Sequence, residues 1–165
     1  MFVLWLILAA IVVLAAVVLV RTARFAPGAA PAVPQGEETI DRDKAVENLR
    51  TLIRCRTVSN TNHELEDDAE FEKLINTLPT LYPNVFKTCK FERLEDRGLL
   101  FTWAGKAHDE PTVLMAHYDV VDVDEAGWKK PPFEGVLEDG VLWGRGALDT
   151  KVTFNGVLTA ADKLI

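Results

Sequence analysis

The sequence predicts an α/β fold preceded by one transmembrane helix. Two helical patterns come before a series of short apolar runs, and helices followed by strands favour a layered α/β sandwich. The uninterrupted apolar run at 2–20 precedes both and contains no charge and no proline. We therefore expect a transmembrane anchor or signal segment at 1–20, a linker at 21–38 and a folded domain at 39–165.

The first segment, Phe2 to Val20, has the length and composition of a membrane helix. At 1.5 Å per residue it nearly spans a hydrocarbon core of about 30 Å. A cleaved signal peptide is the alternative, because small residues at 26–32 offer a cleavage site. Signal peptides usually have a basic start and a shorter apolar core of about 7 to 15 residues, so an uncleaved anchor is favoured.

The side of the membrane on which the domain lies stays open. Arg21 and Arg24 follow the span and no basic residue precedes it, so the positive-inside rule predicts a cytoplasmic domain. Pro27, Pro31 and Pro34 then predict that 21–38 cannot sustain a helix and forms a semi-rigid spacer. A tail without a role is the alternative.

Helical spacing predicts two helices in the domain. Apolar residues recur at helical intervals in 41–56, with Asp41 as the cap, and again in 64–78. The second helix carries acids that we expect to form a solvated face: Glu64, Glu66, Asp67, Asp68, Glu70 and Glu72. Pro79 and Pro83 are expected to interrupt the helical pattern.

Four strands are expected after these helices. They lie near 85–91, 99–104, 113–116 and 136–144, with turns at 95–98 and 138–140. Cys55 and Cys89 belong to no metal or disulfide motif and are expected to be buried free thiols. The net charge of -7, without a basic cluster, argues against a nucleic-acid partner.

A short acid and histidine pattern in the second half of the chain indicates a metal site. Successive side chains alternate on an extended chain, so His117 and Asp119 point the same way. Imidazole and carboxylate are zinc ligands, and the two oxygens of Asp149 allow it to bridge two ions. The alternative is a histidine hydrogen-bonded to a nearby acid without metal. His63 and His108 lie in polar contexts and are expected at the surface.

The glycines before Asp149 predict an unusual backbone conformation there. Gly144 and Gly146 permit close approach or positive φ, and Leu148 is expected to point into a core. Trp128 and Phe133 are expected either to shape a pocket edge or to pack a long loop against the sheet.

Three ordered runs carry a family resemblance: 113–121, then Trp128 with 131–135, then 144–151. They resemble the two-zinc aminoacylase and carboxypeptidase family, and within it the carboxypeptidase S and N-fatty-acyl-amino-acid synthase/hydrolase branch. The runs 56–59 and 99–105 look like that branch too. The chain departs from the family at Asp122, where proline is usual, and at Thr150.

The resemblance implies a zinc-exopeptidase-like α/β/α sandwich, of which 39–165 would be the amino-terminal part. It implies that His117 binds one zinc, that Asp149 bridges two zincs through its carboxylate, and that Asp119 is the catalytic-site acid that orients His117. It also implies a cis peptide after Asp149. The family's general-base glutamate and remaining ligands follow beyond position 165, so the fragment alone is expected to be inactive.

The expected function is a zinc-dependent metallohydrolase that cleaves amide bonds. Its substrates would be peptides, as for a carboxypeptidase, or N-acyl amino acids, and its membrane contact would be Phe2 to Val20. The alternative is a membrane-tethered non-catalytic fragment or binding module with an incomplete metal site. No feature of the sequence indicates an oligomeric state.

Overall fold

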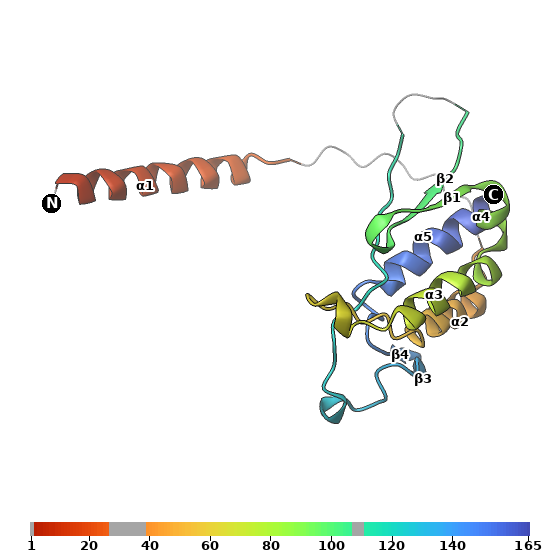
Figure 1. Ribbon diagram of the computed structural model, residues 1–165. Helices are drawn as coiled ribbons and strands as arrows, with labels where there is room; N and C mark the ends of the chain where they lie inside the picture. The colour runs from red at the N-terminus through yellow and green to blue at the C-terminus, as the bar shows by residue number, and fades with distance from the viewer. Residues whose placement is uncertain (1, 27–38, 107–110) are drawn as a thin grey trace. The chain divides into compact units, whose positions relative to one another are not determined.

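The computed structural model describes residues 2–26, 39–106 and 111–165, and the chain divides into two compact units, 1–38 and 39–165 (Figure 1). In the first unit, α1 (Phe2–Ala23) is exposed along its length and is long and apolar enough to cross a membrane. The helix continues three residues into the predicted spacer, so the expectation of no helix there was wrong for 21–23. The rest of the spacer from 27, and His108, lie outside the described residues.

Four α-helices form the framework of the second unit: α2 (Arg42–Ile53), α3 (Asp68–Leu81), α4 (Pro83–Thr88) and α5 (Lys151–Leu164). The carboxylate of Asp41 accepts from the Lys44 N–H at 3.0 Å, which confirms the predicted cap of α2. α5 packs against α2 and α4 (Figure 1). The short 3-10 turns are η1 (His63–Leu65), η2 (Glu95–Arg97) and η3 (Glu125–Gly127).

The third helix differs from its prediction at both ends. α3 begins after Asp67, whose carboxylate accepts from the Ala69 N–H at 3.0 Å, and η1 occupies the predicted first turn. The expected stop at Pro79 was wrong, because that proline lies inside the helix. Pro79 sits in the last turn and is exposed, so the missing N–H costs little where the buried face ends at Leu78.

The strands form two antiparallel hairpins. β1 (Lys90–Arg93) pairs with β2 (Leu99–Thr102), and β3 (Val136–Glu138) pairs with β4 (Val141–Trp143). The mixed α/β composition is thereby confirmed. The predicted strand at 85–91 was largely wrong, because Pro83 in the first turn starts α4.

The predicted strand at 113–116 was also wrong. Val113, Leu114 and Met115 are exposed and no neighbouring strand pairs with them in the described part of the chain. Pairing begins only at Val120, which forms a parallel bridge with Val58. A β pattern without a partner leaves an extended segment, since a strand needs a ladder to form.

The core lies among the four helices. It gathers buried apolar side chains from all of them, including Leu52, Leu74, Leu78, Val85 and Phe154. Tyr118 joins this core through ring contacts with Phe71 and Phe154, at centroid distances of 6.1 Å and 5.8 Å. The segment that carries His117 is therefore fixed to the helices by its next residue.

A buried lysine ties the start of α5 to the end of α2. The Lys151 ammonium donates to the Leu52 carbonyl at 2.8 Å and to the Cys55 carbonyl at 2.7 Å. Burial lowers the pKa of Lys151 to about 8. A cation among the last carbonyls of a helix is favourable, so the contact stabilises this junction.

We predict that Lys151→Met lowers the free energy of unfolding by about 1 to 3 kcal/mol, because it removes hydrogen bonds from a charged donor while keeping side-chain volume. Denaturant unfolding of the full chain in detergent, followed by circular dichroism, measures this. Lys87→Met, at an exposed position of α4, is the matched control. Equal stability of both variants would contradict the prediction.

Two glycines with positive φ allow a controlled comparison. Gly146 has φ of +82° and a Cβ there would lie 2.6 Å from Val120 Cγ1, whereas Gly140 has φ of +76° and open space. Gly140→Ala should cost about 1 kcal/mol from backbone strain alone. Gly146→Ala should cost distinctly more in the same unfolding assay, because the methyl must also displace Val120. Equal losses would show that the close approach is unimportant.

Candidate metal centre

Three expected site residues come together in the second unit. His117 Nε2 lies 3.2 Å from Asp149 Oδ1, although 32 positions separate the two residues. On the other side of the ring, His117 Nδ1 lies 3.1 Å from Asp119 Oδ1 and 3.1 Å from the Asp119 carbonyl oxygen. The structure thus places His117 between two carboxylates.

Asp119 is itself held by a hydroxyl. Ser59 Oγ donates to Asp119 Oδ2 at 2.6 Å, while Oδ1 faces the imidazole. The two oxygens of one carboxylate therefore have different partners. Asp119 therefore holds the Nδ1–H, and Nε2 is left to bind a proton or a metal ion on the side of Asp149.

The electrostatics of His117 follow from these neighbours. Partial burial lowers the pKa of the imidazole, but hydrogen bonding to Asp119 and the negative charges of Asp119 and Asp149 outweigh it and raise the pKa overall. The two carboxylates therefore favour a positive charge at this position, and a metal ion and a proton would compete for His117 Nε2.

The ligand types suit a zinc-like ion, but few ligating side chains are in place among the described residues. The Asp149 side chain is 89% exposed, and within the described residues His117 is the one side chain that contacts its carboxylate, at Oδ1. In the part of the chain that the structure describes, no group of three or more histidine, cysteine, aspartate or glutamate side chains is placed to hold one metal ion. One imidazole and one carboxylate fit as a partial site for zinc, with Asp119 behind the imidazole.

The loop before Asp149 has the close backbone approach and the positive φ that its glycines predicted. A Cβ on Gly144 would lie 2.6 Å from Ile53 Cγ2, and Gly146 has positive φ. The peptide between Asp149 and Thr150 is cis, as the resemblance implied. Leu148 is 86% exposed, so its expected place in a core was wrong, because the loop turns it outward.

A hollow of about 660 Å³ lies beside His117 and Asp119. Its wall is mainly apolar and includes Val113, Met115 and Phe154. Trp128 and Phe133 are absent from this wall; each stacks on an arginine, Arg145 at 5.1 Å and Arg56 at 4.5 Å. The packing interpretation of these two rings is favoured over the pocket edge.

Sequence reasoning missed three polar groups near the site. Ser59 lies in the run 56–59, which was used only as part of the family resemblance. Lys151 follows Asp149 by two positions. Glu66 was expected on a solvated face, but its side chain is 1% exposed, so that expectation was wrong. Of the three, only Lys151 had a signal in the sequence, its position two residues after Asp149. The contacts of Ser59 and Glu66 depend on partners farther away in the sequence. His63 is at the surface as predicted, and both cysteines are free.

Comparison with known proteins indicates the family of the chain. Residues 113–165 match peptidase family M20/M25/M40. The chain is 36% identical over 135 residues to carboxypeptidase S of Saccharomyces cerevisiae, covering 75% of this chain and 23% of that protein. It is 34% identical over 138 residues to the N-fatty-acyl-amino acid synthase/hydrolase PM20D1 of Homo sapiens, covering 81% and 27%.

A further relative is an uncharacterized carboxypeptidase of Schizosaccharomyces pombe, 42% identical over 124 residues, 70% of this chain and 21% of that protein. The chain spans about a quarter of the length of these curated relatives. The family match at 113–165 covers His117, Asp119 and Asp149. The chain therefore belongs to peptidase family M20/M25/M40, in the branch that contains carboxypeptidase S and the N-fatty-acyl-amino acid synthase/hydrolases.

Proposed function

We propose that this chain contributes His117, Asp119 and Asp149 to the two-zinc centre of an amide-bond hydrolase. The observation that carries the proposal is the convergence of His117 Nε2 and Asp149 Oδ1 at 3.2 Å from distant parts of the sequence. The proposal includes the α/β/α sandwich of zinc exopeptidases as the fold of the intact domain. Asp149, whose exposed carboxylate has two oxygens, would bridge both ions.

Each residue has a definite task in this proposal. His117 binds through Nε2, and Asp119 holds the Nδ1–H so that the ring keeps its orientation. Asp149 binds through its carboxylate from the loop before α5. A zinc ion bound there would lower the pKa of a water molecule and polarise the scissile carbonyl.

The substrates follow from the hollow and from the relatives. An apolar wall beside His117 supports a substrate with an apolar acyl or side-chain group. The names of the relatives point to carboxypeptidase action and to N-fatty-acyl amino acids. We propose peptides or N-acyl amino acids as the substrate class. Because no larger group of ligating side chains is placed to hold a metal ion within the described residues, turnover is proposed only for a protein that supplies further ligands and a general base.

The central prediction concerns zinc. His117→Ala and Asp149→Ala should each weaken zinc binding by at least about 100-fold, more than loss of an outer partner usually costs. Competition with a chelating dye, on the full chain in detergent, measures the affinity. In the natural-length protein, both variants and chelator treatment should abolish hydrolysis of an N-acyl amino acid.

Glu138→Ala is the matched control, because Glu138 is an exposed carboxylate of β3 that pairs with Lys130 at 2.6 Å. It should leave zinc affinity near the wild-type value. Zinc binding that is unaffected by His117→Ala would defeat the proposal. That result in a folded protein would favour the membrane-tethered binding module.

The first unit is proposed as the membrane anchor. Val12→Lys with Val13→Lys should release the chain from membranes, because a lysine near the centre of a span costs about 2.5 to 3.5 kcal/mol. Alkaline carbonate extraction, with amino-terminal sequencing of the recovered chain, measures retention and tests for cleavage. Leu137→Lys with Val141→Lys, at exposed positions of β3 and β4, is the control. Wild-type chain in the soluble fraction, or an amino terminus after position 26, would rule out the anchor.

A further inference from the structure

A short parallel pairing brings Ser59 beside the candidate metal centre. The Val120 N–H donates to the Thr57 carbonyl at 2.8 Å and the Ser59 N–H donates to the Val120 carbonyl at 2.9 Å. Thr57 is fully buried and its hydroxyl donates to the Tyr118 carbonyl at 2.6 Å. Three hydrogen bonds therefore fix the register of the Ser59 backbone against the segment that carries His117 and Asp119.

This register decides the orientation of the Asp119 carboxylate. His117 Nδ1 has two acceptors at 3.1 Å, the carbonyl oxygen and Oδ1 of Asp119. Asp119 is partly exposed, and no other described donor contacts its carboxylate besides Ser59 and His117. Because Ser59 occupies Oδ2, Oδ1 is left to face the ring. The hydroxyl thus selects which way the carboxylate turns.

A buried carboxylate holds the loop that carries Ser59. Glu66 Oε1 accepts from the Asn60 N–H at 2.7 Å, and Oε2 contacts His63 Nδ1 at 3.1 Å and the Arg97 guanidinium. The Asn60 hydrogen bond is the main reason that the pKa of Glu66 falls to about 2, so Glu66 is charged throughout the neutral range. The residue after Ser59 is therefore anchored by an ionised and almost fully covered side chain.

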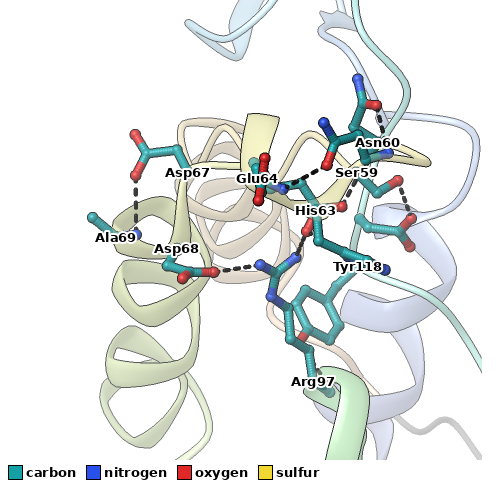
Figure 2. Close-up of polar contacts among 12 residues, drawn as sticks. Ser59, Asn60, His63, Glu64, Asp67, Asp68, Ala69, Arg97 and Tyr118 are labelled. Carbon is teal, nitrogen blue, oxygen red and sulfur yellow. Dashed lines mark hydrogen bonds and ion pairs between the residues drawn. The ribbon is translucent and has the colours of Figure 1, made fainter.

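Arg97 connects this anchor to the core. Its guanidinium also pairs with Asp68 and lies 3.8 Å over the Phe71 ring, and its carbonyl accepts from the Tyr118 hydroxyl at 2.6 Å. Figure 2 shows Arg97 pointing toward Asp68 and the loop at 59–63, with Tyr118 alongside. The Ser59 loop is therefore braced from α3, from the β1–β2 turn and from the His117 segment.

We propose that Ser59 is a positioning residue for the metal centre: its hydroxyl orients Asp119, and through Asp119 the imidazole of His117, from a loop braced by Glu66 and Arg97. This inference rests on the proposed function, because it concerns the same zinc ligand. It adds Ser59, which is not itself a ligand, to the residues on which metal affinity depends.

The test is a double-mutant cycle on zinc affinity, measured by chelating-dye competition on the full chain in detergent. Ser59→Ala should weaken zinc binding about 10-fold, the lower end of the loss typical for partners behind a ligand. Ser59→Thr keeps the hydroxyl and should restore most of the affinity. In the Asp119→Ala background, Ser59→Ala should have no further effect, because the hydroxyl acts through that carboxylate.

The control is Thr77→Ala, which deletes a hydroxyl whose hydrogen bond stays within α3, to the Lys73 carbonyl at 2.7 Å. It should leave zinc affinity unchanged. Circular dichroism and the melting temperature of each metal-free variant report whether it is folded. If Ser59→Ala fails to fold, Ser59→Cys replaces it in the cycle, because a thiol keeps the size and donates only weakly.

The outcomes separate the two proposals. Zinc binding that does not depend on His117 overturns the proposed function, and the inference falls with it. Zinc binding that depends on His117 but is the same in Ser59→Ala overturns the inference alone. An equal loss from Ser59→Ala with and without the Asp119 side chain also overturns it, because Ser59 would then act through the fold and not through the carboxylate.

Discussion

Two short segments, 57–59 and 118–120, run side by side through three backbone and hydroxyl hydrogen bonds. The first segment leaves the end of α2, and the second carries Tyr118 into the core between Phe71 and Phe154. His117 and Asp119 flank Tyr118, so their side chains point away from the core. The segment that holds them is extended but belongs to no sheet.

Charged groups near the pairing are satisfied by specific partners from distant positions. Lys151 enters from the start of α5 and donates to two carbonyls at the end of α2. Glu66 enters from the loop before α3 and receives donors from Asn60, His63 and Arg97. Such groups are costly to bury alone and stable when fully paired. They fix the loops that lead to the pairing, whereas the Asp149 side chain remains open to solvent.

The sequence predicted those features that depend on nearby residues. The apolar length of α1, the Asp41 cap, β2 and the turn between β3 and β4 follow from local pattern, and His117 and Asp119 share a direction because of the two-residue period. The strand at 113–116 failed because a strand requires a partner that no local pattern reveals. Glu66 was placed in solvent because its neighbours are acids, yet Arg97 reaches it from 31 positions away. Ser59 was missed for the same reason, since its role depends on Asp119, 60 positions later.

The coordination of zinc by this chain is the most direct test of the account. X-ray absorption spectroscopy at the zinc edge of the loaded full chain should show nitrogen and oxygen scatterers at about 2.0 to 2.2 Å, including imidazole, and no sulfur near 2.3 Å. The imidazole signal should disappear in His117→Ala. A sulfur shell from Cys55 or Cys89, or an imidazole signal that persists in His117→Ala, would contradict a centre built on His117 and Asp149.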